Sequence, residues 1–151
     1  KESAMRITME ADYAIRILYH LSKENMRCDS GAMAEKLGIP KRYCLKILHA
    51  LSCAGLVCSY PGKGGGYELA VSPALVTLRR IIELIDGPIW LSRCQSDEVN
   101  CTRVQNKEHC MFHCIFAQLG KQLCEKLDRI TLSDVINPEN TTNDVLKKIQ
   151  F

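Results

Sequence analysis

Soft metal ligands are concentrated in one polar segment, residues 93–114 (RCQSDEVNCTRVQNKEHCMFHC), which holds four of the nine cysteines and two of the four histidines. The first three cysteines follow the spacing Cys94-x6-Cys101-x8-Cys110. Three thiolates on a loop can close around one metal centre when a fourth donor completes the set. Structural zinc sites usually take cysteines roughly two to four residues apart. The wider separations of these three cysteines therefore favour a larger centre, an iron–sulfur cluster.

The fourth donor is expected where the loop meets a rigid element. His113 and Cys114 follow Cys110 closely and fall on the first turn of a predicted long helix. His109, beside Cys110, is a spare candidate. The alternative is that these are surface thiols without a ligand. The polarity of the segment argues against that alternative, because cysteines without a ligand are usually buried.

The remaining cysteines and histidines have simpler explanations. An odd number of cysteines cannot all form disulfides and no charged-then-apolar leader opens the sequence, so we expect a cytoplasmic protein with reduced thiols. Cys58 falls on a predicted strand, and Cys28 is left without a role. Three cysteines within helices are expected to pack as small hydrophobic side chains: Cys44, Cys53 and Cys124. His20 and His49 also fall within helices and are interpreted as structural histidines with satisfied hydrogen bonds.

The excess of positive charge lies in the N-terminal half of the sequence. Through Ser72 there are ten Lys and Arg against seven Asp and Glu, whereas the remainder has ten of each, so the whole excess of +3 is N-terminal. That half is therefore the candidate for contact with DNA. No apolar run approaches the roughly 18 residues that a bilayer requires, so no membrane is expected as a partner. Residues 1–4 precede Met5 and are interpreted as the remainder of an expression tag.

Two short helices joined by a tight turn follow a first amphipathic helix over residues 8–24. Ser30 is expected to cap a brief helix that stops at Gly38, where a left-handed backbone costs least. Pro40 suits the first turn of the next helix, which is expected to end near Gly55. This is the helix-turn-helix pattern. A plain helical hairpin with a solvated basic face is the alternative.

A predicted β-hairpin, LVCSY and YELAV around the turn PGKGGG, comes directly after these helices. A helix-turn-helix followed by a hairpin is the layout of a winged helix. The turn lacks the spaced glycines and the Lys-Ser/Thr ending of a phosphate-binding loop, which makes a nucleotide site improbable on motif grounds. The predicted DNA contacts are the basic residues and neighbours that this layout presents: Ser30, Lys41, Arg42, Tyr43, Lys46 and Lys63.

The C-terminal half is expected to mediate dimerisation. A helix spans TLRRIIELIDG, and after the cysteine loop a long helix runs from about Met111 to Ile130 with an apolar stripe that includes Ile115, Leu119 and Leu123. Thr131 and Asp134 form a predicted capping box, and the polar tail from Asn137 is expected to be partly disordered. Pairing of two long helices would cover the stripe. Folding of the helix back onto its own domain is the alternative.

The fold class predicted from these elements is mainly α with a small β-hairpin wing: a winged helix-turn-helix plus a long C-terminal dimerisation helix. The expected organisation is a DNA-binding domain at residues 5–72, the cluster loop and dimerisation helix at 73–136, and a polar tail at 137–151.

Four stretches together resemble the Rrf2 family of bacterial winged-helix regulators: MRITMEADYAIRILYHL, MAEKLGIPKRYCLKILHALSCAGLV, GKGGGYELA and the three cysteines after LSRC. The resemblance covers residues 5 to about 137. It implies a homodimer with crossing long helices and a [2Fe-2S] or [4Fe-4S] cluster on Cys94, Cys101 and Cys110. For the fourth ligand it implies His113, or a carboxylate from the opposite subunit's first helix, Asp12 or Glu10. Cys114 is a further candidate, and the gaps between the cysteines are longer than is usual in the family.

The sequence therefore predicts a homodimeric transcriptional regulator, not an enzyme, that binds double-stranded DNA and senses redox state, nitric oxide or iron–sulfur status through a cluster. Two alternatives stay open. One is a regulator of the same fold, without a cluster, that senses through a protein partner such as a cysteine-biosynthesis enzyme. The other is a small iron–sulfur redox protein, which would leave the basic N-terminal half unexplained.

Overall fold

The computed structural model describes residues 6–96, 101–102, 104 and 106–150, and these residues form a mainly helical protein with one two-stranded antiparallel hairpin. This confirms the predicted fold class. The α-helices are α1 Met9–Glu24, α2 Ser30–Leu37, α3 Lys41–Cys53, α4 Leu78–Asp86, α5 Met111–Asp128, α6 Leu132–Ile136 and α7 Thr142–Lys147. The strands are β1 Val57–Tyr60 and β2 Gly66–Leu69, and the 3-10 turns are η1 Pro73–Leu75, η2 Arg93–Gln95 and η3 Lys107–His109.

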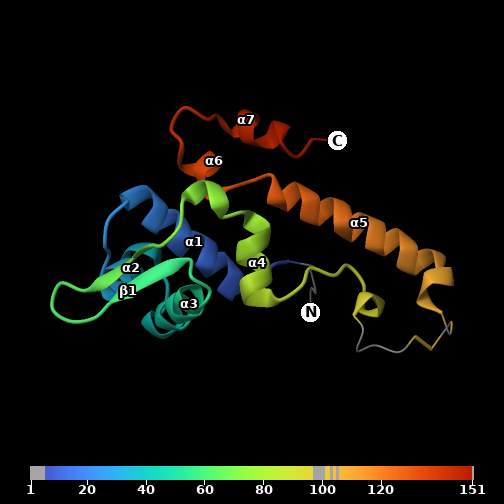
Figure 1. The fold of residues 1–151 in the computed structure, drawn as a ribbon, viewed down its shortest axis with the longest axis horizontal. Helices are drawn as coiled ribbons and strands as arrows, with labels where there is room; N and C mark the ends of the chain where they lie inside the picture. Colours follow the sequence, from blue (N-terminus) through green and yellow to red (C-terminus); the bar gives the residue numbers. More distant parts are fainter. Residues whose placement is uncertain (1–5, 97–100, 103, 105, 151) are drawn as a thin grey trace.

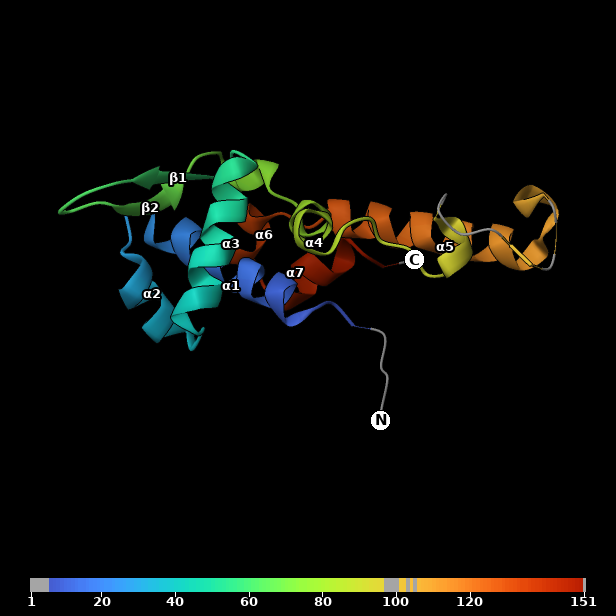
Figure 2. The same cartoon turned by 90° about the horizontal axis from the view of Figure 1, so that it is seen from below.

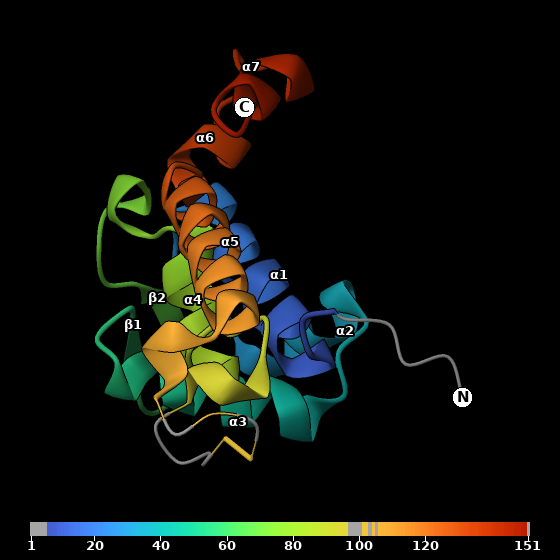
Figure 3. The same ribbon diagram turned by 90° about the vertical axis from the view of Figure 1, so that its right-hand side faces the viewer.

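The molecule has a helical body from which α5 projects (Figure 1). Helix α1 lies at the centre of the body and packs against α3, α4 and α6. The segment after α4 runs out along α5, so that η2 and η3 lie near the end of α5 furthest from the hairpin (Figures 1 and 2). Viewed along α5, the start of this helix is nearest the viewer and the body lies behind it (Figure 3).

The body is held together by one apolar core. The largest fully buried side chains come from all three helices of the helix-turn-helix region and from α4 and α6: Ile17, Leu18, Leu21, Met33, Ile47, Leu48, Leu51, Ile81 and Leu132. Full burial of each such side chain contributes about 1.5–3 kcal/mol. The position of α3 on α1 is therefore fixed by its apolar face.

The helix boundaries follow local signals, with two corrections. Helix α2 is capped by Asp29 instead of Ser30: the Asp29 carboxylate accepts hydrogen bonds from the Gly31 and Ala32 N–H groups, at 2.8 and 3.0 Å. Asp29 is the last residue with extended backbone, which is the conformation of a capping residue. Pro40 is likewise the capping residue of α3 and not part of its first turn.

The hairpin is shorter than predicted and is joined by a third segment. The register pairs Val57 with Leu69 and Tyr60 with Gly66, so β2 ends before Ala70. Cys28 forms an isolated antiparallel bridge with Tyr67 from the connection between α1 and α2, so this connection pairs with the wing at one residue. No pattern in the sequence predicts this pairing of Cys28 with Tyr67.

The C-terminal elements match the prediction as far as α6 and differ beyond it. Helix α5 ends at Asp128 instead of Ile130, and the capping box of Thr131 with Asp134 is present. The tail contains a helix, α7, where partial disorder was expected. Lys126 on α5 donates to the Ile149 carbonyl, which fastens the tail to α5. Within the described residues, no helix is both long and apolar enough to span a membrane.

Candidate nucleic-acid interface and metal centre

Helices α2 and α3 form the helix-turn-helix, with α3 as its second helix. The turn between them passes through Gly38, whose backbone is left-handed at φ 64°. Lys41 and Arg42 open α3 and are exposed to solvent. Ser30 is half-buried at the first position of α2, and its carbonyl accepts from the Cys44 thiol at 3.7 Å. Lys41 and Arg42 are therefore more accessible to solvent than Ser30 is.

Tyr43 is half-buried, and its ring both packs against α1 and contacts Arg42. Its ring lies 6.3 Å from that of Tyr13 on α1, at an interplanar angle of 58°. The Arg42 guanidinium stands 4.8 Å from the Tyr43 ring centre, and its Nη2 lies 3.3 Å from the tyrosine hydroxyl. Tyr43 therefore holds the first turn of α3 against α1 and steadies Arg42 above it.

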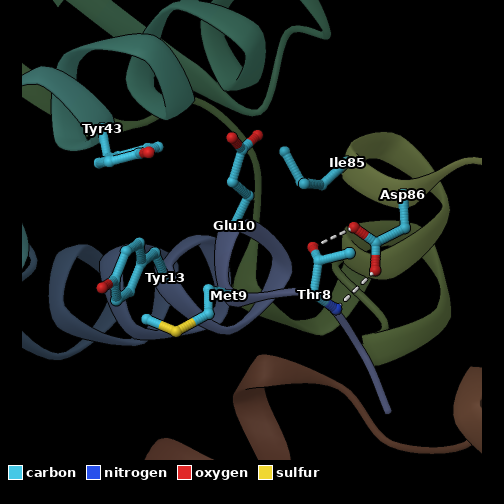
Figure 4. A pocket seen from close by; sticks show the side chains of 7 residues that line it. All are labelled: Thr8, Met9, Glu10, Tyr13, Tyr43, Ile85 and Asp86. Atoms are coloured by element: carbon cyan, nitrogen blue, oxygen red, sulfur yellow. Dashed lines mark hydrogen bonds between the residues drawn. The ribbon is translucent and has the colours of Figure 1, made fainter. Parts of the chain in front are cut away.

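Lys46 is already engaged by a carboxylate. Its Nζ donates to both oxygens of Glu10 on α1, at 2.7 and 2.8 Å. Lys46 is 64% exposed, so the pair lies at the surface. Beside it, between α1, α3 and α4, is an open cleft of about 560 Å³ (Figure 4). It is lined by Thr8, Met9, Glu10, Tyr13, Tyr43, Ile85 and Asp86.

The wing presents Lys63 at an exposed, glycine-rich tip, as predicted from the turn PGKGGG. Arg27 lies over the ring of Tyr60, the last residue of β1 before this turn, at 3.6 Å from the ring centre. Sequence reasoning missed Arg27 because it falls in a connection with no periodic pattern. A basic residue immediately before Cys28 gives no signal of its own until the bridge of Cys28 with Tyr67 is known.

Two predicted ligands of the metal centre meet at the start of α5. Cys94 lies in η2, and its Sγ is 3.5 Å from Nδ1 of His113 and 3.2 Å from Oγ of Ser92. Cys110 is the capping residue of α5. Cys114 is exposed, and its thiol donates to the Glu108 carbonyl at 3.3 Å. Cys94 and His113 are therefore adjacent across 19 residues of sequence.

The other candidate ligands are placed less closely. Cys101 is described and half-buried, but part of the loop around it, residues 97–100, 103 and 105, lies outside the described residues. Among the residues that the structure describes, no three Cys, His, Asp or Glu side chains are close enough to hold one metal ion. The two carboxylate candidates lie on α1: Glu10 pairs with Lys46, and Asp12 pairs with Arg16 at 2.7 Å.

The donor set nevertheless suits an iron–sulfur cluster. Such clusters are held by thiolates, with imidazole replacing thiolate in some. The contact of Cys94 with His113 brings one of each together, and Cys110 begins the helix that carries His113. The residues present therefore fit the group by their chemistry, and the segment between Cys94 and Cys110 carries the third thiol.

Cysteines elsewhere divide into buried and exposed ones. Cys44 and Cys124 are buried, and burial raises the pKa of both thiols, as expected for packed side chains. Cys53 is exposed, so its predicted packing role is wrong: it lies in the last turn of α3, where the helix leaves the core, 3.7 Å from Nε2 of His49. His49 is also exposed, whereas His20 is buried beside Glu24.

Helix α5 carries an uncovered apolar stripe. The large apolar side chains exposed along it are Met111, Phe112, Ile115, Phe116, Leu119 and Leu123. Trp90, in the segment that runs beside α5, is 49% exposed and lines a second cleft that reaches Leu123 and Leu127. Helix α5 packs against α4, but these side chains stay exposed among the residues that the structure describes.

Residues 7–138 match the Rrf2 family, described as iron-dependent transcriptional regulators. The chain belongs to the Rrf2 family. A putative HTH-type transcriptional regulator, rrf2-like, of Rhodobacter capsulatus is 30% identical over 148 residues, covering 93% of this chain and 99% of that protein. The HTH-type transcriptional regulator IscR of Yersinia enterocolitica is 27% identical, covering 90% and 82% of the two chains.

Among solved structures, that of CymR, the global cysteine regulator of B. subtilis, has the same fold. Its TM-score is 0.69 at 25% sequence identity, over 88% of this chain and 97% of that one. The Rrf2 regulators that this chain resembles are DNA-binding transcriptional regulators and not enzymes. The chain is accordingly an Rrf2-family transcriptional regulator with a winged helix-turn-helix fold.

Proposed function

We propose that this Rrf2 chain is a homodimeric, cytoplasmic regulator that senses redox state, nitric oxide or iron–sulfur supply through a cluster held by Cys94, Cys101, Cys110 and His113. The observation that carries the proposal is the 3.5 Å approach of Cys94 Sγ to His113 Nδ1 at the start of α5. The family's description as iron-dependent supports it.

The chain's own residues link such a site to the long helix. Cys110 caps α5 and His113 lies in its first turn, so ligands at both positions fix the loop against the helix end. When bound, a cluster would supply a centre that oxidants and nitric oxide attack and that iron shortage removes. Ordering or release of the loop then shifts the balance between two arrangements of the protein.

DNA recognition is assigned to α3 and the wing. Lys41 and Arg42 lead α3 into the major groove, and Lys63 contacts the sugar–phosphate backbone or minor groove. Tyr43 and Ser30 position the two helices of the motif, and Lys46 joins the contacts when it leaves Glu10. In the proposed organisation, residues 5–72 bind DNA, 73–136 hold the loop and dimerisation helix, and 137–151 form the tail.

Dimerisation is assigned to α5. Its exposed apolar stripe includes Met111, 76% exposed, and Phe112, 56% exposed. Single exposed apolar side chains are common on protein surfaces, whereas a stripe of several typically marks an interaction site. A second copy of the same helix would cover it with a matching apolar surface. Two recognition helices in such a dimer must stand roughly 34 Å apart, or a multiple of one DNA turn, to reach both half-sites.

The test is the composition of protein isolated without oxygen. We expect visible absorption together with iron and acid-labile sulfide, and loss of both on exposure to air or nitric oxide, with a change in DNA affinity. Colourless protein without iron or sulfide, whose DNA affinity ignores the redox conditions, would rule out the cluster. Zinc without sulfide would indicate a structural metal site instead.

A regulator without a cluster is the second candidate. The similarity to CymR and the lack of a preassembled three-ligand group among the described residues favour it. Such a protein would bind DNA fully when free of iron and would respond to a protein partner. The composition measurement above separates these two functions.

A further inference from the structure

The wing is fastened to the body by the residues just before α2. Cys28 N–H donates to the Tyr67 carbonyl at 2.9 Å, and Tyr67 N–H donates to the Cys28 carbonyl at 2.8 Å. Gly66 allows this approach, because its φ is 143° and a Cβ there would lie 2.5 Å from the Cys28 carbonyl oxygen. The connection between α1 and α2 is therefore pressed directly against β2.

Three side chains interact at the same contact between the α1–α2 connection and the hairpin. The Arg27 guanidinium stacks 3.6 Å from the centre of the Tyr60 ring, and its Nε lies 3.8 Å from Oε2 of Glu68. The Tyr60 hydroxyl donates to Oε1 of Glu68 at 2.5 Å, and this bond is the main reason that the pKa of Tyr60 is raised. Arg27, Tyr60 and Glu68 come from the connection, β1 and β2, so the set ties all three segments together.

We propose that Arg27 is a positioning residue for DNA binding. By stacking on Tyr60 and pairing with Glu68, it fixes the angle at which the wing carries Lys63 to the DNA backbone. The inference rests on the proposed function as a DNA-binding regulator and adds to it a residue outside the helix-turn-helix and the wing themselves.

The reason is mechanical. A two-stranded hairpin is only marginally stable alone, and the strands here have four residues each. Tyr60 is the last residue of β1, and Lys63 lies in the turn that follows it. A rotation of the strand end at Tyr60 therefore displaces Lys63, and holding this strand end in place keeps the lysine at phosphate distance.

Charge adds to the mechanical effect. Glu68 is the only acidic residue between Val57 and Ser72 in the sequence. A free carboxylate in the wing would repel DNA phosphates. Arg27 and the Tyr60 hydroxyl both engage this carboxylate, which reduces the repulsion and holds the side chain in place.

The test compares Arg27→Met with a matched variant, Arg16→Met. Arg16 also pairs with a carboxylate, Asp12, and faces a tyrosine, Tyr13, at 5.9 Å, but both of these partners lie on α1 itself. Both changes remove one positive charge from an exposed arginine. The probe is a duplex that the wild-type protein selects from a random-sequence library, titrated at several salt concentrations. We expect Arg27→Met to weaken binding about fivefold more than Arg16→Met does.

A double-mutant cycle with Lys63→Gln separates positioning from direct contact. If Arg27 acts through Lys63, Arg27→Met has little further effect once Lys63→Gln is present, and each single change lowers the salt slope by roughly 0.9. Arg27→Lys keeps the charge but not the flat stacking surface, so we expect it to keep most of the defect.

Three results would overturn the inference: equal effects of Arg27→Met and Arg16→Met, additivity of Arg27→Met with Lys63→Gln, or full rescue by Arg27→Lys. Thermal unfolding of each variant verifies that the fold is retained, and Tyr60→Phe, which keeps the ring but removes the hydrogen bond to Glu68, provides a milder second variant. A wild-type protein that selects no duplex at all would instead refute the proposed function.

Discussion

Lys46 Nζ lies 2.7 Å from Oε1 of Glu10, so a predicted DNA contact on α3 is paired with α1 in the DNA-free protein. A phosphate must compete with this carboxylate for the lysine. We therefore expect Glu10→Gln to raise DNA affinity, by about two- to fivefold, since exposed ion pairs contribute only about 0.2–1 kcal/mol. Fluorescence anisotropy with a selected duplex measures the change.

The matched control for this prediction is Asp12→Asn, on the same turn of α1. It makes the same change of charge, but its partner Arg16 lies on α1 itself. Equal gains for the two variants would show that net charge, and not the release of Lys46, raises affinity. The iron content of both variants is measured alongside, because both carboxylates are candidate fourth ligands.

The cluster assignment predicts a division among the loop cysteines. Replacing Cys94, Cys101 or Cys110 with alanine is expected to bleach the visible spectrum of anaerobically isolated protein and to remove its iron, while the fold is retained. Cys114→Ala is expected to leave both unchanged, since Cys114 is exposed and bonded to the Glu108 carbonyl. An unaltered spectrum in Cys101→Ala would eliminate that thiol as a ligand.

The exposed stripe on α5 predicts a dimer that one charge disrupts. Leu119→Glu places a carboxylate in the centre of the apolar surface, where its desolvation is unfavourable, so we expect a monomer by light scattering and weaker DNA binding. Gln118→Glu introduces the same charge at the adjacent exposed position of the helix and serves as the control. A dimer that survives Leu119→Glu places the interface elsewhere.

The cap of α2 predicts a pH dependence of stability. Hydrogen bonds from the Ala32 N–H, chiefly, and the Gly31 N–H lower the pKa of Asp29 from its ordinary 3.8. A carboxylate whose pKa is lower in the folded state stabilises the fold above its ordinary pKa and loses that contribution as pH falls through the lowered value. Asp29→Ala should therefore lower the unfolding temperature at pH 7 by more than at pH 3. A difference that stays constant with pH would contradict the role of the charge.

The helix-turn-helix could be predicted from sequence because its signals are local. Apolar spacing fixed the buried face of α3, and Gly38 and Pro40 mark the turn. Helix α7 carries the same kind of signal, a capping box of Thr141 with Asp144, which would have predicted a helix in place of a disordered tail. Local signals of this kind therefore indicate that a helix is present, although they did not identify Asp29 as the capping residue of α2.

Contacts between distant segments could not be predicted in this way. The pairing of Lys46 with Glu10 and the bridge of Cys28 with Tyr67 span 36 and 39 residues, and neither leaves a periodic pattern in the sequence. Cys53 shows what helical periodicity cannot predict. Its spacing places it on α3, but only the structure shows that the core ends before it and that its side chain is exposed. The approach of Cys94 to His113 likewise depends on how the loop returns along α5.

The placement of the cysteine loop at the tip of α5 has a consequence for communication. Each loop stands far from the wing of its own chain (Figure 1). In the proposed dimer joined along α5, a stimulus at one loop would have to pass through the paired helices before it reached a DNA-binding domain, and an antiparallel pairing of these helices would bring the loop of one subunit near the DNA-binding domain of the other. Heterodimers that combine a chain with a defective cysteine loop and a chain with defective DNA contacts would reveal such coupling between the subunits.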